Sequence, residues 1–273
     1  MSRAGAVCAS AILALTAVTA ASAQTIWTPI EHRLSVNVEA LHPRFKLDQG
    51  AEASAFSGAV FLTGTIPVAA HGMLVIELPF ARSSFADADG SSSNSSIGNP
   101  YVGLQVGTGA ASRGFVAELG IRPPVVGDND AEAGTTGVFT DLDRQEAFIN
   151  NLTAFSGAAN VYVRGARTGG RLRLGLTEQF LGQDVVDYET ILNYGALGSV
   201  DVDRLRVGAA LTGRYLLTES GSFGDRSFHH AAASASMSFE QLRPGLFVRV
   251  PFDKDIRDVV PSTFGITLEC TFR

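Results

Sequence analysis

The sequence predicts an all-β protein: a single closed antiparallel transmembrane β-barrel of about twelve strands, with short periplasmic turns and long extracellular loops. Three observations predict this fold. Apolar and polar residues alternate with a period of two in many segments. The connections between these segments are alternately short and long. Phenylalanines gather at both ends of the apolar faces.

The first residues are typical of an export signal. Arg3 gives a positive start, residues 4–21 are almost wholly apolar or small, and Ala21-Ser22-Ala23 fits the small-x-small cleavage rule. We expect residues 1–23 to be a cleaved signal peptide and residues 24–273 to form the barrel. The alternative is a membrane anchor, but the stretch is rich in Ala rather than Leu and ends in a cleavage-type site.

The composition of the mature chain excludes several classes of protein. Without Arg3, the 21 basic residues become 20 against 27 acidic ones, a net charge of −7, which argues against a nucleic-acid partner. Cys270 is then the only cysteine, so no intramolecular disulfide forms. No later stretch has the ~18 consecutive apolar residues of a spanning helix. A mature chain in a membrane must therefore cross it as a closed barrel.

The period-two pattern appears in twelve segments of about strand length. In one of them Leu172, Leu174 and Leu176 share one face, while Arg171 and Arg173 share the other. Each segment is close to the 9–11 residues of a tilted membrane strand, and a single-chain bacterial barrel has an even number of strands. The segments run over 33–42, 55–66, 72–81, 99–108, 113–123, 153–164, 170–181, 188–197, 203–216, 227–239, 244–253 and 261–272.

The connections alternate in length, which is the layout of outer-membrane barrels. A secreted soluble β-sandwich or lipocalin-like barrel is the alternative, with its apolar face turned inward. That alternative explains the alternation but leaves the loop lengths unexplained. The short connections are 67–72, 109–113, 165–170, 198–203 and 240–244, and the longer polar ones include 83–96, 125–152 and 218–226.

The phenylalanines on the apolar face form two predicted girdles. Aromatic side chains prefer the two interfaces of a bilayer, so both ends of each membrane strand should carry them. The long-loop ends carry Phe80, Phe155, Phe180, Phe252 and Phe264, and the short-turn ends carry Phe115, Phe239 and Phe272.

The long connection 125–152 is acidic, and its placement is open. Residues 138–150 are compatible with a short helix. The segment would fold into the barrel as a constriction, or collect divalent cations with lipopolysaccharide, or remain a solvated acidic loop, which is the interpretation that the sequence favours. Its acids are Asp128, Asp130, Glu132, Asp141, Asp143 and Glu146, against one base, Arg144.

The polar face of the strands gives the candidate lumen-lining residues. Eight bases against four acids would favour anions in a pore. The alternative is that Arg–Glu pairs bridge the lumen and fill it, since buried charges need partners. The acids are Glu39, Glu77, Glu118 and Glu269, and the bases are Arg122, Arg164, Arg171, Arg173, Arg204, Arg206, Arg214 and Arg249.

The residue pattern gives little support to catalysis, and we predict no enzyme, cofactor or metal site. His229 with Ser227 is the best candidate for a lipid-hydrolysing pair, but no Gly-x-Ser-x-Gly elbow is present. Adjacent residues of a strand point to opposite faces, so His229 and His230 cannot chelate one ion. The acidic Asp-x-Asp-x-Glu at 128–132 is too short for a calcium loop.

Four short segments resemble a family of outer-membrane barrels. They are Ile-Gly-Asn-Pro-Tyr-Val-Gly-Leu at 97–104, Glu-Leu-Pro-Phe at 77–80, Phe-Val-Arg-Val-Pro-Phe-Asp at 247–253 and Gly-Ile-Thr-Leu at 265–268. They are similar to the bacterial transporter-like group labelled for the meta-cleavage pathway of phenol degradation. The resemblance implies a barrel that passes small solutes, including hydrophobic ones. The chain departs from the usual ending of such barrels, because Arg273 follows Phe272.

Two functions follow as hypotheses. The first is a passive channel or facilitator for small solutes, and the second is a barrel with a filled lumen and a structural or surface-interaction role. A lipid-modifying enzyme is a distant third. The expected partners are outer-membrane lipid and lipopolysaccharide, the barrel assembly machinery and a small-molecule solute.

Overall fold

The computed structural model describes residues 32–46, 52–53, 57–87, 90–108, 112–127, 131–182 and 188–272. The predicted signal peptide, residues 1–23, lies outside this part of the chain. Among the described residues, no helix combines the length and apolar character needed to cross a membrane.

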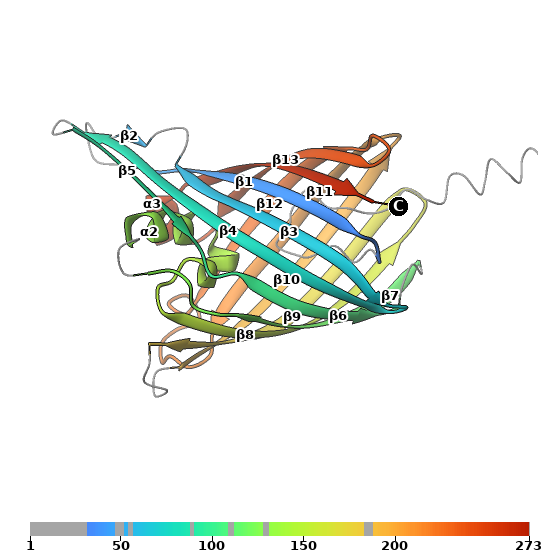
Figure 1. Ribbon diagram of the computed structural model, residues 1–273, viewed down its shortest axis with the longest axis horizontal. Coiled ribbons are helices and arrows are strands. Elements are labelled where there is room, and N and C mark those ends of the chain that lie inside the picture. The colour runs from blue at the N-terminus through green and yellow to red at the C-terminus, as the bar shows by residue number, and fades with distance from the viewer. Residues whose placement is uncertain are drawn as a thin grey trace, which may run out of the picture.

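Twelve long strands form one closed antiparallel barrel, and each of the twelve predicted segments corresponds to one of them (Figure 1). This confirms the predicted fold class. The strands are β1 (Ser35–Arg44), β3 (Gly58–Ala69), β4 (Gly72–Asp87), β6 (Tyr101–Gly107), β7 (Arg113–Arg122), β8 (Leu152–Arg164), β9 (Thr168–Leu181), β10 (Tyr188–Val202), β11 (Leu205–Leu216), β12 (Ser227–Met237), β13 (Leu242–Pro251) and β14 (Ser262–Thr271).

The ring closes at two places. The first and last strands pair along their full length, from Ser35 opposite Thr271 to Arg44 opposite Ser262. They run antiparallel because the number of strands is even. The shorter seam lies between β4 and β6, where only residues 72–77 of β4 have partners on β6. Every barrel strand therefore has a neighbour on both sides, and the backbone presents no open edge within the ring.

Alternation along each strand decides which side chains face outward. In β1 the side chains are buried at every second position from Ser35 onward. In β9 the leucines at 172, 174 and 176 are exposed, whereas Arg171 is buried. Large apolar side chains thus cover the outside, and polar ones face the interior. This is the reverse of the orientation that the soluble β-sandwich alternative requires.

Two further strands extend the sheet beyond the barrel at the long-loop end. The upper half of β4 pairs with β5 (Gly90–Ile97) from Phe80 opposite Ile97 to Asp87 opposite Gly90, and the two-residue strand β2 (Glu52–Ala53) pairs with the other edge of β4. Figure 1 shows β4 and β5 reaching past the other strands. The polar connection 83–96 was predicted as a loop, but its backbone continues the ladder as a hairpin, because pairing does not need apolar side chains.

The connections follow the predicted alternation, with short turns at one rim and longer segments at the other. The turn after β10 is an exception in detail. It was predicted at 198–203, but β10 runs on to Val202 and turns at Asp203 and Arg204. Asp203 adopts a positive φ of 55°, which a short polar side chain tolerates.

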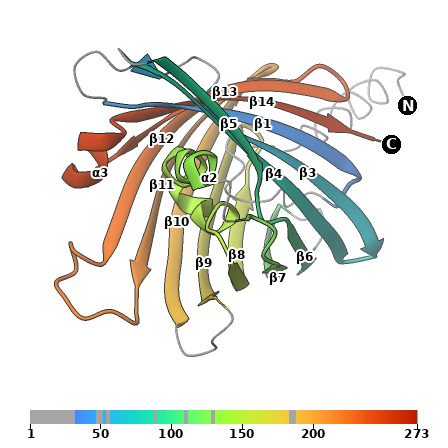
Figure 2. The same cartoon turned by 60° about the vertical axis from the view of Figure 1, so that its left-hand side comes forward.

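Short helices occupy two of the long connections. The helix α2 (Ala131–Thr140) and the 3₁₀ helix η3 (Leu142–Ala147) lie between β7 and β8, and α3 (Lys254–Val259) lies between β13 and β14. Figure 2 shows α2 inside the ring of strands. We call residues 125–151, which include α2 and η3, the inserted segment.

Candidate functional site

The interior of the barrel is the candidate site, and the strands bring most of the predicted lumen-lining charges to it. Their side chains share the inner face because cross-strand partners point the same way, as Glu39, Phe61 and Thr267 do. Arg164 and Arg173 are partly buried on this face. The buried members are Glu39, Glu77, Glu118, Arg122, Arg171, Arg206, Arg214, Arg249 and Glu269.

Arg204 is the exception among the predicted lumen residues. It lies in the exposed turn between β10 and β11, outside the strands. The prediction was wrong because the alternation was extended through a residue that belongs to the turn. Its neighbour Arg206 is buried and pairs with Asp201 at 2.5 Å, close to the short-turn rim.

The inserted segment folds into the long-loop half of the lumen. Of the three interpretations of this connection, the solvated acidic loop is wrong for Asp141, Asp143 and Glu146, whose side chains are largely buried, although Glu132 is exposed. The interior constriction agrees with the structure. Arg144 is buried on η3, and Asp141, which caps the N-terminus of this helix, is buried as well. The acids Asp128 and Asp130 lie outside the described residues.

Arg144 anchors the inserted segment to the barrel wall. Its guanidinium donates to Glu39 at 2.6 Å, to Glu77 at 2.9 Å and, within its own helix, to Asp141 at 2.7 Å. It also lies over the ring of Phe61, 3.4 Å from the centroid. Glu77 is held from its other side by Arg122 at 2.5 Å. One cation therefore joins strands β1, β3 and β4 to the segment.

Three more contacts attach η3 to the opposite wall. Arg249 donates to Asp141 at 2.7 Å, and Arg214 donates to Glu146 at 2.9 Å. His230 Nε2 lies 2.8 Å from the carboxylate of Asp143. The acids of the segment thus meet bases of β11, β12 and β13. This pairing balances much of the surplus of Arg that the wall carries.

Asp141 and Asp143 both have pKa values below the ordinary value of an aspartic acid. Burial alone would raise the pKa of Asp141, but the charges of Arg144 and Arg249 outweigh it and hold the pKa below its ordinary value. Burial likewise opposes the charged form of Asp143, and the charge of His230 beside it lowers the pKa. For Arg144, burial is outweighed by the three neighbouring carboxylates, which raise the pKa further.

Asn99 ties both ends of the inserted segment to one point of the wall. Its Oδ1 accepts from the backbone N–H groups of Val125 and Val126 at 2.7 and 3.0 Å. Its Nδ2 donates to the carbonyls of Glu146 and Ile149 at 3.0 and 2.8 Å. The side chain is fully buried, and all of its hydrogen-bonding capacity is used. Sequence reasoning missed this role, although the Gly-Asn-Pro step before β6 was a visible signal.

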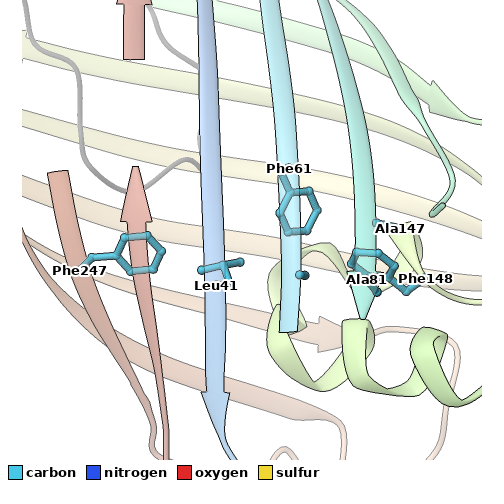
Figure 3. Packing of buried hydrophobic residues seen from close by; sticks show 7 residues of the cluster. Leu41, Phe61, Ala81, Ala147, Phe148 and Phe247 are labelled. Carbon is cyan, nitrogen blue, oxygen red and sulfur yellow. The ribbon is translucent and has the colours of Figure 1, made fainter. Parts of the chain in front are cut away.

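An apolar cluster packs the inserted segment against β1, β3, β4 and β13 (Figure 3). Phe148 meets Phe61 edge to face with ring centroids 5.6 Å apart. Gly137 of α2 lies beneath Phe148, and a Cβ there would come within 2.4 Å of the ring. Sequence reasoning missed these inward apolar residues because Phe61 and Phe247 share a strand face with charged groups. The cluster consists of Leu41, Ala59, Phe61, Ala81, Ala147, Phe148 and Phe247.

A cavity of about 90 Å³ remains beside η3, between the inserted segment and the wall formed by β8–β11. On the wall side it is lined by small residues such as Ala154, Ser156 and Gly175. Asp143 and Glu146 border it from the segment. About 10–15 Å³ of such volume accommodates one water molecule, so several fit here.

The short-turn half of the lumen has a different lining. Gly169, Ser199, Gly208 and Ser234 are cross-strand neighbours that form one row of small residues across β9–β12. Basic side chains lie at the same level on β8 and β9. They include Arg164, which stacks on Tyr162, and Arg171, which donates to Asn160 Oδ1 at 2.8 Å, while Arg173 pairs with Glu118 at 3.2 Å.

The predicted girdle phenylalanines lie on the outer face near the two rims, and all are exposed except the half-buried Phe180. Phe155 and Phe180 touch edge to face on neighbouring strands, with ring centroids 5.9 Å apart. Their contact with a membrane remains a prediction. The long-loop group is Phe80, Phe155, Phe180, Phe252 and Phe264, and the short-turn group is Phe115, Phe239 and Phe272.

His229 and His230 point to opposite faces, as their adjacency on a strand requires. His230 faces the lumen, whereas His229 faces outward and lies 2.5 Å from the hydroxyl of Tyr194 across Gly213. The hydroxyl of Ser227 donates to the carbonyl of Phe223 instead. The hydrogen bonds of the candidate hydrolytic pair therefore go to other groups.

Comparison with known proteins relates the fold to outer-membrane barrels. No family model matches the sequence, and no curated protein matches it. The COG4313 outer membrane channel from Pseudomonas putida F1 is similar in structure, with a TM-score of 0.54 at 12% identity over 93% of this chain and 100% of that chain. LpxR from Salmonella typhimurium gives 0.47 at 10% identity over 87% and 100%. At these identities, the first likeness shows the fold alone.

Proposed function

We propose that the chain is an outer-membrane barrel that acts as a passive channel for small solutes. The observation that carries the proposal is a closed ring with an apolar outer face and a charged interior, which the inserted segment narrows. Apolar outer faces suit lipid, and closure satisfies every backbone group there. The proposed partners are outer-membrane lipid, lipopolysaccharide and the barrel assembly machinery.

The route for a solute passes the inserted segment through the cavity beside η3. The space exists because β8 and β9 carry small residues there. The wall that carries Phe61 and Phe247 is instead covered by the inserted segment. The cavity of about 90 Å³ supports solutes of low molecular mass. Its polar and charged lining supports polar solutes over hydrophobic ones.

Anion preference is the proposed selectivity, and some of the predicted bases support it better than others. Two of the eight bases that the sequence suggested, Arg204 and Arg206, support it weakly, because the first is in an exposed turn and the second is paired with Asp201. Arg164 and Arg171 on neighbouring strands line the short-turn half and support the proposal better. Clustered basic side chains in a pore raise the local concentration of anions.

A filled barrel with a structural or surface role is the second candidate. The contacts of Arg144, Arg249 and Arg214 favour it, because they hold the inserted segment firmly across the lumen. The two candidates differ in one measurable property, which is the passage of ions.

Single-channel recording in a planar lipid bilayer separates the candidates. We expect the purified, heat-modifiable protein to give small, steady openings, with a reversal potential shifted towards that of the anion in a salt gradient. A known porin recorded under the same conditions is the control. The absence of openings in bilayers where that porin conducts would reject the channel and leave the filled barrel.

A further inference from the structure

The outer face of the barrel is hollowed at the long-loop end, where β14, β1, β3, β4 and β5 lie side by side. The hollow has a volume of about 690 Å³ and lies on the opposite side of the sheet from the lumen. Its floor is made by Ala40 and Val60 on adjacent strands. Ile266 stands beside Ala40 on one side, and Phe80 stands beside Val60 on the other.

This groove has the width and chemistry of a site for hydrocarbon chains. Three strand spacings separate β14 from β4, which is about 14 Å between the backbones that carry the two walls. The larger side chains of Phe264 and Ile266 rise on one wall, and those of Phe80 and Ile97 rise on the other. The floor is lower because Ala40 and Gly58 carry little or no side chain. The groove is continuous with the apolar outer face.

Basic side chains lie directly above the apolar floor. His42 stands opposite Phe264, and Arg82 stands opposite Gly58 and Ser95. Arg44 follows two positions after His42, on the same face of β1, and is exposed. Arg82 donates to Ser93 at 3.1 Å, and His42 Nδ1 lies 2.8 Å from the carbonyl of Ser57.

No acidic side chain opposes these bases on the outer face of the five strands, among their described residues. At the same end of the barrel, the outer face of β9 instead carries Glu178. The positive charge is therefore local to the groove. It lies one step beyond the apolar row that contains Phe80, at the level of Phe264.

We propose that this groove binds a phosphorylated glycolipid of the lipid A type from the outer leaflet. An acyl chain lies along Ala40 and Val60, and a phosphate meets Arg44 and Arg82, with His42 between them. Guanidinium groups bind phosphate through paired charge-assisted hydrogen bonds. The inference rests on the proposed outer-membrane function, which places the long-loop end in the outer leaflet. The apolar floor distinguishes a lipid from free phosphate, which has nothing to place there.

Native mass spectrometry of the purified full chain in detergent micelles tests the site. The probes are diphosphorylated lipid A, the same lipid after removal of its phosphates, phosphatidylglycerol and inorganic phosphate. We expect one diphosphorylated lipid to be retained at least tenfold more strongly than its dephosphorylated form. Equal retention of these two lipids would overturn the proposal, as would equal retention of phosphatidylglycerol or binding of inorganic phosphate alone.

Variants locate the binding on the groove. R44Q with R82Q should lower retention at least tenfold, and A40F, which fills the floor without changing charge, should lower it several-fold. R113Q is the matched control, because Arg113 is an exposed base on the outer strand face at the opposite rim. Loss of retention in the control to the same extent would overturn the site.

Two measurements on the same samples separate failure of the site from failure of the barrel. Heat-modifiable migration on a gel reports folding of each variant, and bilayer conductance reports the proposed channel. Wild-type protein that folds and conducts but shows no preference for the phosphorylated lipid overturns the groove alone. Wild-type protein that prefers this lipid but does not conduct overturns the channel alone.

Discussion

The two halves of the lumen are built on the same strands but are lined in opposite ways. In the long-loop half, the carboxylates of η3 meet Arg144, Arg214 and Arg249, and an apolar cluster packs beneath them. In the short-turn half, a row of Gly and Ser lies beside Arg164 and Arg171. One half is narrowed by an inserted element, and the other keeps small side chains along its wall.

The difference shows that wall charges alone do not define the interior of a barrel. The strands carry more Arg than Glu on their inner face, yet the inserted segment supplies Asp141, Asp143 and Glu146 to the half where three of these Arg lie. Buried ions need such partners to offset the loss of solvation. The charges of the segment and of the wall are therefore complementary. Removing the charges of either one should leave those of the other without partners.

The largest effect should follow from removing the element that narrows the long-loop half. Replacing residues 127–145 by a short Gly-Ser linker takes away α2 and most of η3. We expect single-channel conductance to rise several-fold, because the cross-section is no longer divided. Replacing the exposed loop 218–225 by a linker is the control. Unchanged conductance after the first replacement would show that the constriction lies elsewhere.

A smaller effect should follow from removing one anchor of the segment. Arg144→Met leaves Glu39, Glu77 and Asp141 without their shared cation. Breaking a buried pair by removing one partner typically costs about 3–5 kcal/mol. We expect a loss of that order in urea unfolding in lipid vesicles, and noisier openings. Arg206→Met is the comparison, since Arg206 is equally buried but pairs with Asp201 away from the segment. Similar channel noise in both variants would contradict the anchoring role.

Acid should loosen the same contacts within a defined range of pH. Asp141 and Asp143 have pKa values lowered in the folded state, so their stabilisation is complete above the ordinary Asp value of about 4. It is lost progressively as the pH falls below that value. We expect conductance to stay level from pH 7 to about pH 4.5 and to rise below it. A rise already at neutral pH would assign the change to other groups.

The smallest effect should appear in the short-turn half. Exchanging both Arg164 and Arg171 for Gln should lower the anion-to-cation permeability ratio a few-fold, measured as a shift of reversal potential in a salt gradient. Arg204→Ser is the matched control, because Arg204 is an exposed base of the adjoining turn. A shift of equal size in the control would show that the bases at the rim determine the selectivity.

The fold was predictable because each strand carries its own period-two pattern, and exposure of Leu172, Leu174 and Leu176 follows from it. The inner face was predictable for the same reason, up to the turn at Arg204. The inserted segment was not predictable, since the acids of residues 126–150 suit water as well as buried bases. Their partners Arg214 and Arg249 are distant in sequence. The contacts of Phe61 with Arg144 and Phe148 were not predictable, because the alternation indicates which face of the sheet a side chain occupies and not which residues it contacts there.

Asn99 has a consequence for how this barrel tolerates change. Its side chain accepts from the N–H groups of Val125 and Val126 at one end of the inserted segment and donates to the carbonyls of Glu146 and Ile149 at the other, so both ends are held at one point. The free-energy cost of closing a loop between two fixed ends grows slowly with its length, by about 0.6 kcal/mol for each doubling. The length of the insert can therefore change at a small entropic cost, whereas its charges must still match the wall bases Arg214 and Arg249. Asn99 thus fixes where an insert begins and ends on the barrel wall, and not how long the insert is.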